Sequence, residues 1–193
     1  MNLYDAVALG LVQGLTEFLP VSSSGHLVIT EALLGLSIPG ILVEVTLHVG
    51  TLLSVVIVYR SRLWSLVEGA LRGRAEAWRY IGLLVLATIP AGLVGLFFKN
   101  AVEMSFDDPA IAGVMLLVTG VILWTTRRPH RPRTRPLPGP LLALGIGVAQ
   151  AFAILPGISR SGSTIAAALW GGVEGEKAAE FSFLMSLPAI AGA

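Results

Sequence analysis

Long apolar runs separated by short polar segments dominate this chain and predict helices of membrane length. A spanning helix needs about 20 mostly apolar residues, and Tyr80–Phe98 and Pro109–Thr126 meet that requirement. Ile41–Tyr59 is a third run of this kind. We therefore expect three transmembrane spans within residues 41–126.

The start of the chain has a different pattern, because its apolar sequence is interrupted. Leu3–Leu19 and Val21–Leu36 are each apolar, but Pro20 and the serine run that follows it separate them. Proline removes a backbone donor and breaks a helix. We interpret residues 1–36 as a re-entrant helical hairpin that enters the membrane and returns to the same side.

A second segment repeats this design. Pro140–Leu155 and Gly162–Gly172 are apolar and flank a Pro-Gly turn, so residues 137–173 are predicted to form a second re-entrant hairpin. The segments Gly10–His26 and Gly147–Ser163 superpose at a shift of 137 positions, which aligns glutamine with glutamine and Ser-x-Ser-Gly with Ser-x-Ser-Gly. Irregular backbone at bilayer depth survives only when it is buried in protein or lines a polar cavity. Two such segments in corresponding halves indicate a binding site where their turns meet.

Composition supports an all-α, polytopic membrane protein. Of the 193 residues, 54% are hydrophobic and 13% are charged, and the mean hydropathy is +0.80, which is typical of a single membrane domain over residues 1–193. The chain has no cysteine, which excludes disulfides, thiolate metal sites and a cysteine nucleophile.

The first twenty residues lack a basic region and contain Asp5 and Glu17, so we identify no cleaved signal peptide. Residues 180–193 are apolar without a polar tail, and we interpret them as the start of a further span in a C-terminal part that is cut short.

The basic residues predict the orientation of these segments. Of the 13 lysines and arginines, five lie in Arg60–Arg79 and five in Arg127–Arg135. Short cytoplasmic loops are enriched in lysine and arginine, so we expect both loops in the cytoplasm and the acidic loop Lys99–Asp108 outside. Three spans then separate the hairpins, and the second hairpin enters from the opposite face, which makes an inverted-topology repeat. The basic loops can equally anchor to anionic lipid headgroups.

Glu17 is the first candidate for chemistry, because it lies in the first hairpin just before the breaking proline. A carboxylate at membrane depth is unfavourable unless it is paired or bound to a cation. Gln13 lies four residues earlier on the same helical face, so both side chains can converge on one ligand. The alternatives are that Glu17 is a snorkelling or structurally paired acid and that Gln13 bonds a neighbouring backbone carbonyl.

A polar run in each turn offers groups that suit an anion. Helix N-termini bind anions through free N–H groups and their dipole, and a serine near a histidine is the minimal pairing of a nucleophile with a base. Serines before a helix are also ordinary caps. In the first turn the run is Ser22, Ser23, Ser24, Gly25 and His26, and in the second it is Ser159, Arg160, Ser161, Gly162, Ser163 and Thr164.

Arg160 is the only charged residue of the second hairpin. Its guanidinium is always protonated and presents a bidentate fork suited to phosphate, so we expect an oxyanion clamp. The alternative is a structural arginine that pairs with Glu17. Glu44 and His48 lie one turn apart near the start of the third apolar run, where they could face this site or interfacial water.

The two turn motifs resemble the two signature motifs of bacterial undecaprenyl-diphosphatases of the bacitracin-resistance type. The first runs from Gln13 to His26 and the second from Pro156 to Thr164, and the similarity extends over essentially the whole chain. The resemblance implies a multi-pass enzyme of the bacterial plasma membrane, a metal-dependent lipid diphosphate phosphatase. Such an enzyme removes the terminal phosphate from undecaprenyl diphosphate and supplies the lipid carrier for peptidoglycan and other wall polymers. The resemblance also implies a divalent metal ion, Mg²⁺ or Ca²⁺, and a site open to the outer face.

Carried over by position, Gln13 and Glu17 occupy the family's paired acidic-or-amide motif, His26 its histidine and Arg160 its phosphate-binding arginine. We expect Glu17, helped by Gln13, to hold the metal ion. His26 would be the general base for either Ser23 as nucleophile or a water molecule, and both routes stay open. The residues expected to bind the substrate are Ser22, Ser24, Gly25, Ser159, Ser161, Gly162 and Thr164.

A membrane transporter or lipid flippase is the alternative function. Inverted repeats with broken helices are the usual transporter architecture, and the same residues could bind a phosphorylated substrate without hydrolysing it. As partners we expect undecaprenyl diphosphate and membrane lipid, and no nucleic acid. The sequence leaves a homo-oligomer open.

Overall fold

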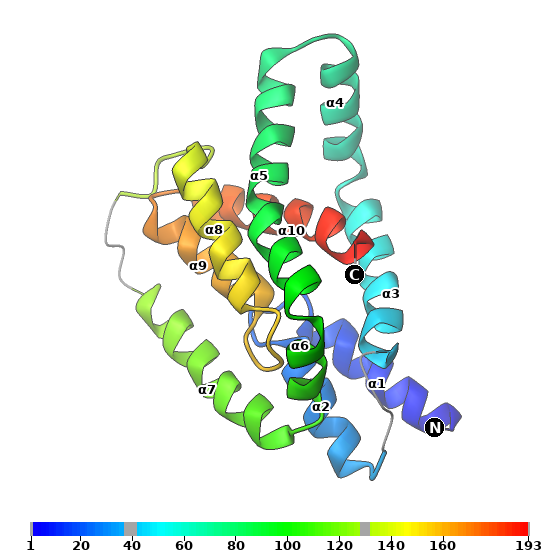
Figure 1. The fold of residues 1–193 in the computed structure, drawn as a ribbon. Coiled ribbons are helices and arrows are strands. Elements are labelled where there is room, and N and C mark those ends of the chain that lie inside the picture. Colours follow the sequence, from blue (N-terminus) through cyan, green and yellow to red (C-terminus); the bar gives the residue numbers. More distant parts are fainter. Residues whose placement is uncertain (1, 37–41, 128–131, 193) are drawn as a thin grey trace.

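The computed structural model describes residues 2–36, 42–127 and 132–192, and the side chains of residues 42–45 lie outside that description. Within the described residues, the regular structure consists of helices, which confirms the predicted all-α class (Figure 1). The helices are α1 (Leu3–Thr16), α2 (Ser23–Leu33), α3 (Leu42–Val58), α4 (Arg60–Leu71), α5 (Ala75–Phe97), α6 (Lys99–Phe106), α7 (Pro109–Thr125), α8 (Pro140–Phe152), α9 (Arg160–Trp170) and α10 (Gly175–Ala191).

Local sequence explains where several helices begin. Asn2 and Asp5 form a capping box at the start of α1, in which each side chain accepts a hydrogen bond from the other residue's backbone N–H. Asp108 caps α7 by accepting from the N–H of Ala110 at 2.8 Å, and Pro109 fills the first position of that helix. The two serine-rich turns supply the caps of α2 and α9.

Two segments that we predicted as connecting loops are helical, and this prediction was wrong. Residues 60–71 form α4, which bends by 71° away from α3, and residues 99–106 form α6, which bends by 97° from α7. The arginines of α4 indicated an exposed loop. In the structure, however, Leu66 is buried in the core and Arg62 pairs with Glu180 of α10 at 2.7 Å. By length and composition, one described helix, α5, could cross a membrane, or up to three could if each bent pair counts as one span.

The hydrophobic core lies around α8 and α9. It is built from α4, α5, α8, α9 and α10 and includes Leu66, Tyr80, Leu83, Ile146, Phe181 and Met185. Gly147 of α8 lies against the backbone of Ala87 in α5, so a side chain larger than hydrogen would collide there. This close contact holds the second hairpin firmly against α5.

The first hairpin is much less covered. One face of α1 is exposed along its length through Tyr4, Val7, Leu11 and Leu15, with exposed fractions of 54% to 85%. Both hairpins pack against α7 through α2 and α9. Figure 1 shows the connection between α8 and α9 next to the turn that joins α1 to α2. The fold therefore brings together two turns that are far apart in the sequence.

Candidate active site

The first turn is held in a strained conformation by its own serines. Ser22 has a φ of 66°, which lies in the left-handed region that residues other than glycine rarely adopt. It caps α2, because its hydroxyl accepts a hydrogen bond from the N–H of Gly25 at 3.3 Å. The Ser23 hydroxyl donates back to the Glu17 carboxylate. Strain of this kind persists where the surroundings fix it, and it is common at functional sites.

The second turn is clamped by α7. Gly157 has φ +95°, and its carbonyl accepts a hydrogen bond from the Thr119 hydroxyl at 2.7 Å. The same hydroxyl oxygen accepts from the N–H of Ser159 at 2.9 Å. Ser159 caps α9 by accepting from Gly162 N–H at 3.0 Å. Sequence reasoning missed Thr119, whose only signal is a lone hydroxyl within an apolar run.

The two turns touch, as the repeated motifs predicted. A Cβ atom placed on Gly25 would lie 2.6 Å from the Cα atom of Gly157. A Cβ atom on Gly162 would lie 3.2 Å from the carbonyl oxygen of Pro20, and the Ser161 hydroxyl donates to the carbonyl of Leu19 at 3.5 Å. Glycine at position 25 is therefore required by the approach of two backbones.

Glu17 lies where the turns meet and receives donors from four helices. Arg160 Nη2 of α9 is 2.6 Å from Glu17 Oε1. Gln13 Nε2 of α1 donates to Oε2 at 3.2 Å, and the Ser23 hydroxyl of α2 donates to the same oxygen. His48 Nε2 of α3 is 3.5 Å from Oε2. The Glu17 side chain is only 7% exposed, so these contacts compensate for the loss of water around the carboxylate.

Two polar atoms at this centre are buried without a hydrogen-bond partner among the described residues. They are Arg160 Nη1 and Gln13 Oε1. Buried polar atoms in native proteins are nearly always paired, and an unpaired one is unfavourable. Arg160 therefore uses one arm of its fork on Glu17 and leaves the other able to donate to an anion, while Gln13 leaves an oxygen able to accept.

His26 is oriented by the first turn. Its Nδ1 is 2.7 Å from the carbonyl oxygen of Ser22. A carbonyl oxygen only accepts, so Nδ1 carries the proton and Nε2 of the neutral ring keeps its lone pair. That tautomer suits a general base. The Ser23 hydroxyl donates to Glu17 in this structure, so among the described contacts it is not joined to His26.

The described side chains do not by themselves form a site for a divalent cation. The described residues contain no group of three or more histidine, cysteine, aspartate or glutamate side chains able to hold a metal ion. Mg²⁺ is commonly bound by one or two carboxylates together with phosphate oxygens and water. Glu17 Oε1 accepts one hydrogen bond from Arg160 and retains a lone pair, and Gln13 Oε1 is unpaired among described residues. Each of these oxygens is of the kind that a hard cation prefers, and a shared metal site of Glu17 and Gln13 stays a prediction.

The remaining predicted residues make local contacts in the two turns or in α9, and their roles stay predictions. The Ser24 hydroxyl is 3.2 Å from that of Ser22, and the Ser161 hydroxyl is 3.3 Å from that of Ser159. Thr164 is fully buried one turn inside α9, where its hydroxyl contacts that of Ser182 in α10 at 2.6 Å.

The structure decides one alternative that the sequence left open. His48 faces the site rather than interfacial water, because it contacts Glu17. The prediction for Glu44 concerns a side chain outside the described residues.

Together, the fold and the site define an all-helical protein in which two helical hairpins enclose a buried carboxylate–arginine pair. The chain belongs to the family of the bacitracin resistance protein BacA, whose sequence model matches residues 6–193. This confirms the resemblance that the two motifs indicated.

Curated relatives carry the name undecaprenyl-diphosphatase. The protein of Desulfatibacillum aliphaticivorans is 44% identical over 211 aligned residues, which cover 100% of this chain and 76% of the relative. The protein of Syntrophotalea carbinolica is 47% identical over 198 residues, with 100% and 75% covered. The protein of Carboxydothermus hydrogenoformans is 44% identical over 195 residues, with 100% and 72% covered.

Proposed function

We propose that this chain hydrolyses undecaprenyl diphosphate to undecaprenyl phosphate and inorganic phosphate, and so supplies the lipid carrier for cell-wall synthesis. The family and the names of the relatives support this activity. The observation that carries it is Arg160, which is 18% exposed and joined to Glu17 by Nη2 while Nη1 is buried without a partner among described residues. A guanidinium arm in that state suits a phosphate oxygen.

We further propose that both hairpins are re-entrant and form an inverted-topology repeat in the bacterial plasma membrane, in a multi-pass protein whose site faces the outer side. The repeat is supported by matching caps, because Ser22 and Ser159 each accept a hydrogen bond from the glycine three residues later. The exposed apolar face of α1 supports contact with lipid. The basic segments Arg60–Arg79 and Arg127–Arg135 support the orientation.

In this proposal, the residues of the second turn bind the diphosphate. Arg160 Nη1 donates to an oxygen of the terminal phosphoryl group, and free N–H groups at the starts of α9 and α2 add partial positive charge. Charge develops on the phosphoryl oxygens during transfer, and donors fixed beforehand stabilise that charge best. Catalysis of phosphoryl transfer depends mainly on such positioning and electrostatic stabilisation.

His26 accepts the proton of the attacking hydroxyl. In one route, water attacks the terminal phosphorus, its proton passes to His26 Nε2, and the bond from that phosphorus to the bridging oxygen breaks. Undecaprenyl phosphate then leaves with the bridging oxygen. In the other route, Ser23 attacks the terminal phosphorus and gives its proton to His26, undecaprenyl phosphate leaves with the bridging oxygen, and water then hydrolyses the phosphoserine to release inorganic phosphate. The hydrogen bond from Ser23 to Glu17 favours the water route, because the serine must first leave this partner.

Glu17 and Gln13 would hold Mg²⁺ or Ca²⁺, and such an ion, when bound, supplies positive charge next to the diphosphate oxygens. Glu17 also keeps Arg160 extended toward the first turn. The single carboxylate of Glu17 would thus contact both the cation and the Arg160 guanidinium.

The test is release of inorganic phosphate from undecaprenyl diphosphate by the purified chain in detergent, with and without EDTA. We expect phosphate release that stops with EDTA and returns with Mg²⁺ or Ca²⁺. Arg160→Ala serves as the inactive control for contaminating phosphatases. Substrate binding without phosphate release would contradict the proposal and favour transport, and release unaffected by EDTA would contradict the metal assignment alone.

A further inference from the structure

The start of α10 is held against two other helices. Glu180 accepts hydrogen bonds from Arg62 of α4 at 2.7 Å and from the hydroxyl of Tyr80 in α5 at 3.2 Å. Lys177, one turn earlier, donates to the other oxygen of the same carboxylate at 3.3 Å. The ring of Phe181 packs edge-on against that of Tyr80, with the two centroids 5.9 Å apart. This part of α10 is therefore fixed in place and can support other elements that pack on it.

Ser182 connects α10 to the helix that carries Arg160. Its hydroxyl is 2.6 Å from that of Thr164, and the two side chains are 1% and 0% exposed. The Thr164 hydroxyl lies 2.7 Å from the carbonyl oxygen of Arg160. A carbonyl oxygen only accepts and each hydroxyl has one proton, so Thr164 donates to Arg160 while Ser182 donates to Thr164. This chain of two hydrogen bonds ends at the first residue of α9.

Phe183, the next residue, connects α10 to the first turn. Its ring centroid is 5.9 Å from that of Phe18, which directly follows Glu17 in the sequence. It is also 6.2 Å from the ring of Tyr59, which lies between α3 and α4. Aromatic pairs at such distances are favourable. Two neighbouring residues of α10 thus contact the two segments that supply Glu17 and Arg160.

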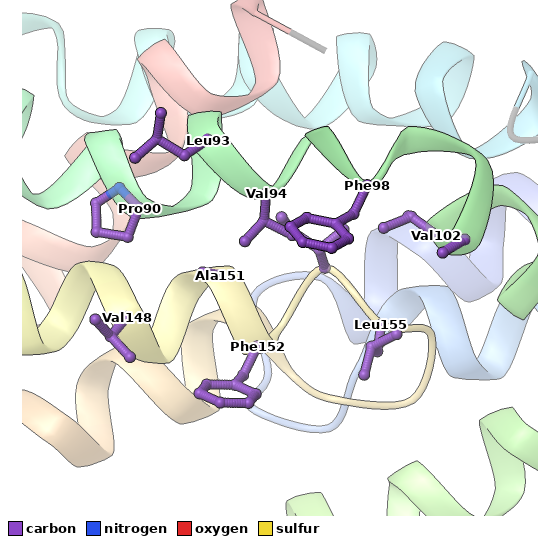
Figure 2. A pocket seen from close by; sticks show the side chains of 11 residues that line it. Pro90, Leu93, Val94, Phe98, Val102, Val148, Ala151, Phe152 and Leu155 are labelled. Carbon is purple, nitrogen blue, oxygen red and sulfur yellow. The ribbon is translucent and has the colours of Figure 1, made fainter. Parts of the chain in front are cut away.

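The second turn depends on support of this kind, because one side of it borders an apolar groove of about 510 Å³. Figure 2 shows the groove with α5 and α6 on one side and the end of α8 on the other. Ile154 and Leu155 line it and lead directly into the second turn. Packing is incomplete on that side, so contacts with other helices, α7 and α10 among them, hold the start of α9 in place.

We propose that Ser182 and Phe183 are positioning residues for the reaction, which keep Arg160 Nη2 and Glu17 Oε1 at their separation of 2.6 Å. This inference rests on the proposed function. Among the described contacts, neither residue touches the guanidinium or the carboxylate, so each acts through its neighbour in the second or the first turn segment. Side chains that support a site in this way matter, because a displacement of about 1 Å can lower a rate by about 100-fold.

Each residue has a matched control on the same helix. Phe181 is also a phenylalanine of α10 with an aromatic partner, but that partner is Tyr80 of α5. Ser186 is also a buried serine, but its hydroxyl donates to the carbonyl of Phe183 within α10 at 2.6 Å. The variants are therefore Phe183→Leu with Phe181→Leu as its control, and Ser182→Ala with Ser186→Ala as its control.

We expect Phe183→Leu and Ser182→Ala each to lower kcat by about tenfold and to change KM by less than about twofold, because a small displacement affects the transition state more than substrate binding. Both controls should keep kcat within about twofold of the unchanged chain. Phe181→Leu should nevertheless be inactivated by heat more easily than Phe183→Leu, since Phe181 is the more buried of the two. Equal losses of kcat in variant and control would reduce the effect to stability and overturn the proposal.

A double variant tests the route through Thr164. Thr164→Val combined with Ser182→Ala should lower kcat no further than the stronger of the two single variants, because both changes interrupt the same chain of hydrogen bonds. Losses that multiply would show that Ser182 does not act through Thr164 and would overturn this part of the proposal.

Hydrogen exchange separates this inference from the proposed function, because it needs no substrate. We expect the backbone N–H groups of residues 160–164 to exchange about three- to tenfold faster in Ser182→Ala than in Ser186→Ala, as for the loss of one hydrogen bond. Residues 17–21 should likewise exchange faster in Phe183→Leu than in Phe181→Leu. Faster exchange in a protein that releases no phosphate would support the positioning of the two turns and contradict hydrolysis. Phosphate release with equal exchange in variant and control would overturn the positioning role and leave hydrolysis standing.

Discussion

Replacing Gly25 by alanine tests whether the two turns really form one site. The added Cβ atom would lie 2.6 Å from Gly157 Cα, 3.0 Å from Gly157 N and 3.2 Å from Leu116 Cδ2. The two shortest contacts are with backbone atoms, which cannot rotate away as a side chain can. The first turn must therefore move away from the second, and Glu17 and Arg160 lie on those two turns.

The magnitude follows from two opposing effects. Overpacking a close contact destabilises a protein by about 1–3 kcal/mol, while alanine in place of glycine in a helix stabilises by about 0.5–1 kcal/mol. We expect a net loss of roughly 0.5–2 kcal/mol in the free energy of unfolding. Activity should fall further, by about 100-fold, because catalysis is sensitive to a displacement of about 1 Å.

Thermal inactivation and phosphate release in detergent measure these two effects. Gly113→Ala is the control, since a Cβ atom there meets nothing within 4 Å, and it should be neutral or stabilised by up to about 1 kcal/mol. A Gly25→Ala protein with the activity and heat resistance of the control would refute the contact between the turns.

Three further predictions separate the roles of the site residues. Arg160→Lys should lower kcat by about 10²–10³-fold, because an ammonium cannot contact Glu17 and a phosphate as a fork does; a near-normal rate would make Arg160 a structural counter-ion. Glu17→Gln should raise the metal concentration needed for half-maximal activity. His26→Ala should lower the rate by roughly 10²–10⁴-fold with little change in that concentration. The reverse pattern in metal titrations would exchange the roles of Glu17 and His26. His48→Gln should retain more activity than His48→Ala, since glutamine keeps an N–H donor near Glu17, and equal activities would show that the contact is not needed.

The sequence predicted those features that depend on local chemistry. Proline and glycine break helices wherever they occur in an apolar run, so the interruptions near Pro20 and Gly157 could be located from the sequence. The serines at positions 22 and 159 mark helix starts, because a serine hydroxyl can accept a hydrogen bond from a free backbone N–H group of the first turn. The repeat predicted that the two turns meet, and an unpaired buried carboxylate is unfavourable, but the ion pair of Arg160 with Glu17 was predicted only as the alternative to the phosphate clamp.

Features that depend on tertiary packing could not be predicted in this way. The α4 segment looked like a basic loop because its arginines dominate, and only the partner of Arg62 on α10 shows why it is helical and docked. Thr119 resembles any hydroxyl in an apolar helix until the second turn is placed beside it. The position of His48 depends on how α3 packs against α1, which no local pattern gives.

The two hairpins share a backbone design but divide the chemistry between them. At a shift of 137 positions, Ser23 corresponds to Arg160, and both donate to the single carboxylate of Glu17. Neither hairpin alone contains both charges. Removing one partner of a buried pair is unfavourable by about 3–5 kcal/mol, so Glu17 needs its guanidinium as long as the two turns are docked. The pair of Glu17 and Arg160 therefore forms the centre of the site and also adds to the backbone contacts that hold the two turns together.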